Sequence, residues 1–296
     1  MELRTLRYFL LAAREENITR AAELLHVTQP TLSRQLMQLE RELDTKLFHR
    51  GQHNITLTND GMLLKRRAQE LVDLADKTER EFTRTESSLT GELSIGSGET
   101  LSMYTLYQWI ASFRKENPFV QYDIYSATAD EIKDRIEKGI LDMGLLVEPV
   151  DVSKYELIRM PIKERWGILT QADSDLAQQE YAAPEDLTHI PLLIAKRSQV
   201  QDALRGWFGP QFETLEIIGT YNLLYNAAVM VKNGVASALA TEHDRTYEGL
   251  RFIPLWPTLE RGAVLVWKKH SACSPVAAQF FAHVQKCVEC MPDDTV

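Results

Sequence analysis

The chain has 296 residues, of which 44% are hydrophobic and 25% are charged, with only 14 glycines and 11 prolines. This composition is typical of folded domains and excludes a disordered, collagenous or coiled-rod protein, while the length predicts two or more domains. The formal net charge of -9 is unevenly spread. Residues 1–67 hold 11 Lys and Arg against 8 Asp and Glu, whereas residues 91–296 hold 19 against 28.

The sequence carries no signal for a membrane or for export. No run approaches the roughly 18 continuous apolar residues that a membrane helix needs, and the start Met1-Glu2-Leu3-Arg4 lacks the pattern of a secretory signal. The three cysteines all lie between positions 273 and 290 and are too few for a disulfide framework. These features predict a soluble protein of the reducing cytoplasm.

Apolar spacing in the first ninety residues is helical nearly throughout. One stripe predicts an amphipathic helix over residues 3–15 and comprises Leu3, Leu6, Phe9, Leu10 and Ala13. Asn17 or Thr19 can cap a second, short helix, and Thr28 can cap a third. Pro30 is tolerated in the first turn of that third helix. A short helix, a tight turn and a capped helix are the pattern of a helix-turn-helix.

The third helix has two contrasting faces. Its predicted buried stripe comprises Leu32, Leu36, Leu39 and Leu43. The opposite face comprises Pro30, Arg34, Met37, Gln38 and Arg41, flanked by Gln29 and Ser33. An ordinary solvated face is the alternative, but such faces usually carry Glu and Lys. Gln, Ser, Thr and Arg suit base edges in the major groove of DNA.

A hairpin and a long helix follow. Residues 46–50 and 55–57 flank a polar tip and predict a small β-hairpin or wing. Thr58 then caps a helix predicted to run to about Ser87, which is roughly 40 Å at 1.5 Å per residue. Its heptad spacing predicts a seam for a partner helix, formed by Leu64, Ala68, Leu71, Ala75, Thr78 and Phe82. We therefore expect dimerisation through this helix.

From Gly91 onward, short apolar strands alternate with helices, which predicts an α/β fold with parallel sheets. The predicted strands are residues 93–96, 120–125, 141–147, 166–170, 192–195, 215–218, 235–240 and 263–267. The predicted helices are residues 101–116, 129–138, 199–208, 222–233 and 275–290.

The N-terminal region resembles the winged helix-turn-helix of LysR-type transcriptional regulators. The motifs that carry the resemblance are residues 17–22 (NITRAA), 25–36 (LHVTQPTLSRQL), 47–50 (LFHR) and 57–61 (LTNDG), together with Leu39, Glu40 and Leu43. More weakly, residues 139–145 (GILDMGL) and 229–236 (VMVKNGVA) resemble segments of the family's effector domain. The resemblance thus covers essentially the whole chain.

The resemblance implies a transcription factor whose two α/β subdomains are similar to periplasmic solute-binding proteins and clasp a small-molecule effector. It implies a winged helix-turn-helix over residues 1–58, a linker and dimerisation helix over 59–90, effector subdomain I over 91–162 with 268–296, and effector subdomain II over 163–267. The implied partners are double-stranded DNA, further copies of the chain in a dimer of dimers through residues 59–87 and the effector domains, and RNA polymerase. An activator or dual regulator is expected, with no metal and no cofactor besides the effector.

The resemblance also assigns DNA-binding residues. The family's contacts fall on Gln29, Pro30, Ser33 and Arg34, with Thr28, Thr31 and Gln38 beside them, and Arg50 supports the wing. His53 stands where an Arg commonly reaches the minor groove. Asp44 stands where the family mostly has Gly, so we expect a left-handed backbone there, which Asp tolerates better than most residues.

Candidate effector contacts lie where strands end and helices begin, because backbone N–H groups converge there. They comprise Ser97, Gly98, Glu99, Thr100, Thr128, Arg197, Ser198, Gln199, Tyr221 and Asn222. Plain helix capping is the alternative for all of them; Thr128 with Glu131 forms a capping box. Glu99 beside a helix start either occupies the positive end of the helix or repels anions, which argues against an aromatic carboxylate as effector.

Other functional classes find little support in the sequence. The chain has no GxSxG, HExxH or Walker motif and no complete GxGxxG, so no catalytic residue is predicted and an enzyme is not expected. A pure solute-binding protein would need export, but the sequence starts with a predicted helix-turn-helix and shows no secretory signal. His283, Cys287 and Cys290 have helical spacing, but they leave zinc one ligand short and are expected in the core. The mid-domain cysteine pair of peroxide-sensing members is absent, so a redox sensor is not expected.

Overall fold

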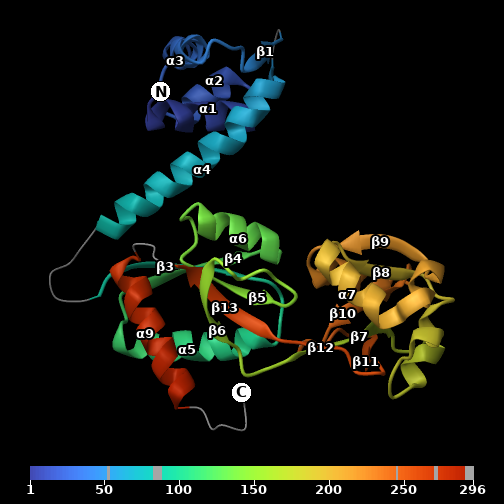
Figure 1. Cartoon of the computed structure of the whole chain (residues 1–296). Helices are drawn as coiled ribbons and strands as arrows, with labels where there is room; N and C mark the ends of the chain where they lie inside the picture. Colours follow the sequence, from blue (N-terminus) through green and yellow to red (C-terminus); the bar gives the residue numbers. More distant parts are fainter. Residues whose placement is uncertain (52–53, 83–88, 245, 270–272, 291–296) are drawn as a thin grey trace. The chain divides into compact units, whose positions relative to one another are not determined.

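The computed structural model describes residues 1–51, 54–82, 89–244, 246–269 and 273–290 (Figure 1). The chain folds as two compact units, Met1–Thr83 and Arg84–Val296. Within the described ranges, no helix combines the length and the apolar character needed to cross a membrane.

The first unit, called the head below, confirms the predicted order of helices and hairpin. Its elements are α1 (Leu3–Glu15), α2 (Ile18–Leu24), α3 (Gln29–Glu42), the antiparallel pair β1 (Phe48–Arg50) and β2 (Ile55–Leu57), and α4 (Asn59–Phe82). The Asn17 side chain caps α2 by accepting the backbone N–H of Arg20 at 3.0 Å. Thr58 likewise accepts the N–H of Gly61 at 3.0 Å at the start of α4. The predicted continuation to Ser87 falls outside the described residues.

The apolar stripe of α3 forms the centre of the head. Leu32, Leu36 and Leu39 are fully buried against α1 and β1, as predicted. Leu43 is 39% exposed, so its place in the stripe was wrong: α3 ends at Glu42, and Leu43 lies in the turn that follows.

The seam predicted on α4 is divided between two surroundings. Leu64 and Ala68 pack into the core of the head, where α1 lies against α4, so they do not face a partner helix as predicted. Leu71 is 41% exposed and Leu74 is 40% exposed. The apolar surface that α4 leaves open therefore keeps Leu71 of the predicted seam and adds Leu74, which was not part of it.

The second unit, called the effector unit below, contains two sheets, which define its two subdomains (Figure 1). The first has the order β4-β3-β5-β13-β6, with β3 (Gly91–Ser97), β4 (Val120–Ser126), β5 (Met143–Val147), β6 (Tyr155–Arg159) and β13 (Ala263–Lys268). The second has the order β11-β7-β10-β8-β9, with β7 (Glu164–Gln171), β8 (Leu192–Ala195), β9 (Ile217–Tyr221), β10 (Ser237–Thr241) and β11 (Leu250–Pro254), and with β12 (Glu260–Arg261) also on β7.

Both sheets are mixed, so the prediction of parallel sheets was only partly right. β3 is parallel to β4 and β5, and β8 is parallel to β9 and β10. However, β13 runs antiparallel to β5 and β6, and β7 runs antiparallel to β10 and β11. Residues 263–267, which were predicted in the second subdomain, therefore lie in the first sheet, because β13 returns there to pair with β5.

Helices cover both faces of each sheet. In the first subdomain, α5 (Ser102–Glu116) and α9 (Pro275–Glu289) pack on one face and α6 (Ala129–Glu137) on the other (Figure 1). Gly144 of β5 permits the approach of α6, because a Cβ there would lie 2.5 Å from the side chain of Ile132. In the second subdomain, α7 (Ser198–Phe208) and α8 (Leu224–Lys232) cover opposite faces. Short 3-10 helices span Asp175–Gln178, Pro184–Leu187 and Gly209–Thr214.

Candidate functional site

The first candidate site is the outer face of α3. Thr28, Gln29, Pro30, Arg34 and Gln38 are exposed, and Thr31 and Ser33 are half-buried. Thr28 lies at the N-cap of α3, but its hydroxyl oxygen is 2.8 Å from that of Thr31 and makes no capping bond to the helix. Arg34 Nε donates to the carbonyl of Pro30 at 3.3 Å. The guanidinium makes no ion pair with another described residue, so its terminal amino groups remain for a ligand.

The wing next to this face is described only in part. Arg50 lies on β1 opposite Ile55, but its side chain, like the whole of His53, lies outside what the structure describes. Asp44 has a backbone φ of 47°, which confirms the left-handed conformation expected at this position.

A buried carboxylate, which the sequence analysis named only among the residues of the family resemblance, joins α3 to the wing. Glu40 is 3% exposed and accepts the backbone N–H groups of Leu47 at 2.9 Å and Phe48 at 3.4 Å. Lys46 lies 3.5 Å away as its ion-pair partner. Glu40 therefore fixes the start of β1 relative to the exposed face of α3.

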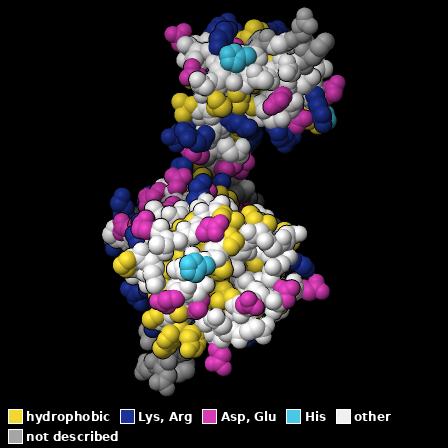
Figure 2. All heavy atoms as spheres, turned by 90° about the vertical axis from the view of Figure 1, so that its right-hand side faces the viewer, with side chains coloured by type: hydrophobic (Ala, Val, Ile, Leu, Met, Phe, Trp, Pro, Cys, Tyr) yellow, Lys and Arg dark blue, Asp and Glu magenta, His cyan; other side chains and the backbone are white. Residues whose placement is uncertain are grey.

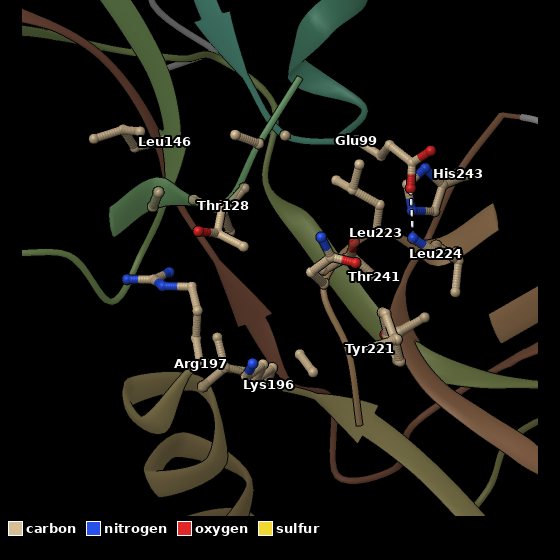
Figure 3. A pocket seen from close by; sticks show the side chains of 18 of the residues that line it. Glu99, Thr128, Leu146, Lys196, Arg197, Tyr221, Leu223, Leu224, Thr241 and His243 are labelled. Atoms are coloured by element: carbon tan, nitrogen blue, oxygen red, sulfur yellow. Dashed lines mark hydrogen bonds between the residues drawn. The ribbon is translucent and has the colours of Figure 1, made fainter. Parts of the chain in front are cut away.

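The second candidate site is a pocket of about 130 Å³ between the two subdomains of the effector unit (Figure 3). Six predicted residues line it: Gly98, Glu99, Thr128, Arg197, Tyr221 and Asn222. The remaining wall is mostly apolar and includes Leu145, Leu146, Val147, Trp166, Val200, Leu223 and Leu224. Predicted residues from both subdomains thus meet at one cavity.

Four predicted effector contacts do not line this pocket. The Ser97 hydroxyl donates to the carbonyl of Gly98 at 2.8 Å, and Ser198 is exposed at the first turn of α7. Gln199 lines a neighbouring cavity, and Thr100 lines another, of about 300 Å³, together with Tyr104. Ser97, Thr100, Ser198 and Gln199 therefore lie outside the pocket that the other six residues line.

Two helix starts at the cleft are occupied by the protein's own carboxylates. Glu164, at the beginning of β7 and 0% exposed, accepts the N–H groups of Leu101 and Ser102, each at 3.0 Å, at the start of α5. Its carboxylate also accepts the hydroxyls of Thr100 and Ser102. Glu99 crosses to the other subdomain and accepts the N–H of Leu224, at the start of α8, at 2.5 Å. The positive ends of α5 and α8 are therefore satisfied without a ligand.

The opposite side of the pocket is basic. Arg197 is only 12% exposed, donates to Asp130 at 3.3 Å in an ion pair between the subdomains, and donates to the carbonyl of Pro149 at 3.2 Å. Thr128 and Glu131 form the predicted capping box at the start of α6, with the Thr128 hydroxyl donating to Glu131 at 2.8 Å. Lys196 also lines the pocket. In Figure 3, Lys196 and Arg197 lie across the cavity from Glu99 and His243.

Sequence reasoning missed Lys196 and His243. His243 follows β10 and lies near Glu99, and burial lowers its pKa, although the charges of Glu99 and Glu164 act in the opposite direction. Burial, followed by the charge of Glu99, raises the pKa of Tyr221, whose hydroxyl donates to the carbonyl of Leu239 at 2.6 Å. Both of these side chains are therefore neutral at pH 7.

The cysteine and histidine cluster lies away from the pocket. His283 Nε2 is 2.7 Å from the hydroxyl oxygen of Ser112 and 3.5 Å from Cys287 Sγ, and its ring packs against Phe113 between α5 and α9. Within the described ranges, no three His, Cys, Asp or Glu side chains are grouped so that they could hold a metal ion.

Comparison with family models divides the chain as the structure does. Residues 3–62 match the bacterial regulatory helix-turn-helix protein model of the lysR family. Residues 86–287 match the LysR substrate binding domain.

Relatives and solved structures agree with these matches. The HTH-type transcriptional regulator YybE of Bacillus subtilis (strain 168) is 26% identical over 290 residues, which cover 96% of this chain and 98% of the relative. YvbU of the same organism, also named as an HTH-type transcriptional regulator, is 24% identical over 82% of each chain. A crystal structure of full-length CbnR complexed with its target DNA has the same fold, with a TM-score of 0.77 at 22% identity, over 97% of this chain and 99% of CbnR. The chain belongs to the LysR family and is a DNA-binding transcriptional regulator with an effector-binding domain, rather than an enzyme.

Proposed function

We propose that the outer face of α3 reads base edges in the major groove and that the pocket of the effector unit binds the molecule that regulates this reading. The observation that carries the proposal is that both subdomains contribute to the walls of one pocket and bond to each other across it, through Glu99 to Leu224 and Arg197 to Asp130. A molecule bound there contacts both subdomains. It therefore favours the arrangement of subdomains that it fits best.

Within the head, Gln29, Pro30, Ser33 and Arg34 are the proposed base-reading residues. An Arg guanidinium can donate two bonds to guanine, and a Gln amide can pair with adenine, while phosphate contacts set the position of the helix. Thr28, Thr31 and Gln38 flank these residues on the same face. Arg50 and His53 complete the proposal on the side of the wing.

We further propose that the protein acts as a dimer of dimers. On α4, Met62, Leu63, Leu71 and Leu74 are exposed large apolar side chains. In the effector unit, a second exposed apolar set comprises Ile124, Ile217, Ile218, Tyr225, Val229 and Met230. Unburied apolar side chains of this size support association with further copies of the chain. RNA polymerase as a partner, an activating or dual role and action in the cytoplasm belong to the same proposal.

The charge distribution indicates that association of several copies of the chain also strengthens DNA binding. Residues 1–67 carry a surplus of only three positive charges, and acidic side chains are scattered over the face of the effector unit that Figure 2 shows. Because phosphate contacts supply much of the affinity for DNA, one head alone binds weakly. Two or four linked heads raise the affinity through effective concentration.

Footprinting with the full-length protein tests the proposal. The DNA is the region upstream of the chain's own gene, probed with and without a broad panel of small metabolites. We expect a protected region whose extent changes with at least one metabolite. A footprint that no metabolite changes would contradict the regulatory role of the pocket, and the absence of any footprint on this DNA or on sequences selected from a random pool would contradict the assignment of α3.

A further inference from the structure

The charged side chains that line the pocket are not all neutralised. Arg197 is paired with Asp130 at 3.3 Å, and Glu148 is paired with Arg159 at 3.1 Å. Lys196 has no ion pair with another described residue. Lys196, which is exposed, and Glu99 line the pocket on its two sides, so one positive and one negative side chain lie at opposite walls (Figure 3).

Glu99 has bonding capacity left for a ligand. One carboxylate oxygen accepts the N–H of Leu224, and a carboxylate has two oxygens that can each accept more than one bond. The neighbouring imidazole of His243 does not neutralise it at pH 7, because burial lowers the pKa of His243. This wall therefore favours a cationic group with N–H donors.

The opposite wall favours an anionic group. Lys196 directly follows β8, and Arg197 is the N-cap residue of α7. An anion there meets the ammonium of Lys196. The same anion at the Glu99 wall would meet a carboxylate and two helix starts that are already filled.

The volume of the pocket sets the size of the molecule. The cavity measures about 130 Å³, slightly less than the roughly 150 Å³ apolar cavity that holds one benzene molecule. Between the charged walls, the lining includes Leu146, Trp166 and Val200. The space thus suits a short hydrocarbon segment with a polar group at each end.

We infer that the effector is a small ω-amino acid, with a carboxylate at the end near Lys196 and an ammonium group at the end near Glu99. This inference rests on the proposed function and names the ligand class of the same pocket. A simple carboxylate leaves Glu99 without a cationic partner, and a simple amine leaves Lys196 without an anionic one. An α-amino acid carries both charges on one carbon and meets only one wall at a time.

Four probes of nearly equal size test the inference by titration calorimetry with the full-length protein at pH 7.5. They are 5-aminopentanoate, its isomer norvaline, pentanoate and pentylamine. We expect 5-aminopentanoate to bind at least about ten-fold more tightly than each of the others, which corresponds to about 1.4 kcal/mol. Equal or tighter binding of norvaline, pentanoate or pentylamine would overturn the inference, as would the absence of binding by all four.

Two substitutions locate the selectivity. Lys196→Met keeps most of the length of the side chain and should abolish the advantage of 5-aminopentanoate over pentylamine. Glu99→Gln keeps an oxygen for the N–H of Leu224 and should abolish the advantage over pentanoate. Lys115→Met, at an exposed position of α5, is the matched control and should change neither ratio. Thermal unfolding of each variant shows that it is folded, and an unchanged preference in both folded pocket variants would contradict the assignment of the two walls.

The inference and the proposed function fail in different ways. If a metabolite of another class changes the footprint and binding of this metabolite depends on Lys196 or Glu99, the ω-amino acid assignment is wrong while the regulatory pocket stands. If 5-aminopentanoate binds with the expected selectivity and leaves the footprint unchanged, the ligand class stands and the proposed regulation is wrong.

Discussion

The face of α3 and the pocket of the effector unit are built in different ways. The proposed DNA contacts of α3 follow one another along a single helix and its N-cap residue, from Thr28 to Gln38. The pocket is lined by residues from Gly98 to His243, which come from strand ends and helix starts in two separate sheets. Helical periodicity therefore predicts the first surface directly, whereas the second exists only when distant segments have folded together.

The head and the effector unit each contain a buried carboxylate, and the two carboxylates join elements at different separations along the chain. Glu40 joins α3 to the strand that follows it closely in sequence. Glu164, on the first residue of β7, joins the second sheet to the start of α5, more than sixty positions earlier in the chain. We therefore expect the loss of Glu164 to affect the arrangement of the whole effector unit. The loss of a contact within the head should affect only the elements around it.

The largest expected effect comes from Glu164→Ala. The substitution leaves the N–H groups of Leu101 and Ser102 and two hydroxyls buried without their acceptor, so we expect the free energy of unfolding of the effector unit to fall by about 3 kcal/mol or more. Urea denaturation monitored by Trp fluorescence measures this free energy of unfolding. Glu156→Ala, at an exposed position of β6, is the control and should stay within about 0.5 kcal/mol of the parent. A loss below about 1 kcal/mol for Glu164→Ala would show that this carboxylate does not hold the two subdomains together.

Arg34→Ala tests the base-reading face of the head. We expect DNA affinity to fall by about 1–3 kcal/mol and preference among DNA sequences to relax, because a bidentate contact to guanine is lost. Arg14→Ala is the control, because Arg14 is an exposed arginine of α1, outside the outer face of α3. Electrophoretic mobility shifts over a series of altered sites provide the measurement. Equal loss of preference in both variants would argue against a specific role for Arg34.

Asn17→Ala tests whether the short helix α2 depends on its cap. The substitution removes the acceptor of the Arg20 N–H and should lower the free energy of unfolding of the head by about 1 kcal/mol. Thr28→Ala removes a side chain at the equivalent position of α3 that makes no capping bond, so its effect on stability should be smaller. Thermal unfolding of the head, monitored by NMR, measures the loss of stability in each variant. A larger loss in Thr28→Ala than in Asn17→Ala would contradict the capping roles described above.

Asp44→Gly should have the smallest effect on stability, and it should stabilise the protein, whereas the other substitutions destabilise it or weaken DNA binding. Asp44 has a φ of 47°, a region that glycine adopts without strain. Glycine also loses more conformational entropy on folding, which offsets part of the benefit. We therefore expect the free energy of unfolding to rise by about 0.5 kcal/mol. Glu16, with a φ of 50°, offers a second test, and Glu16→Gly should also be neutral or stabilising. Destabilisation in both variants would show that side-chain contacts, and not backbone strain, dominate at these turns.

The success of the sequence-based predictions also differs between local structure and contacts between distant segments. The helices of the head, the cap of α2 by one of two candidates, Asn17, and the capping box at Thr128 depend on neighbouring residues, and all were confirmed. The left-handed backbone at Asp44, which the resemblance implied, was confirmed as well. The errors concern partners that are distant or belong to another element. Leu64 and Ala68 were assigned to a partner helix because spacing alone cannot say which neighbour covers a stripe.

The effector unit shows this limit most clearly. The apolar pattern of β13 suits either sheet, and only pairing with β5 and β6 places it in the first. β6, β11 and β12 are short and carry charged residues among apolar ones, so they gave no clear strand signal. Lys196 and His243 belong to no motif of their own. They become pocket residues because the ends of β8 and β10 meet α6 and Glu99 from the other subdomain.

The most direct test of coupling between pocket and head is the reciprocity of two affinities. DNA affinity of the full-length protein is measured without ligand and with a saturating amount of the tightest-binding metabolite, and metabolite affinity is measured without and with DNA. If the pocket regulates the head, the two affinities change by the same factor, because linkage is reciprocal, and Lys196→Met abolishes the change at the same metabolite concentration. A metabolite whose binding depends on Lys196, but which alters neither DNA affinity nor the footprint, would contradict regulation through this pocket.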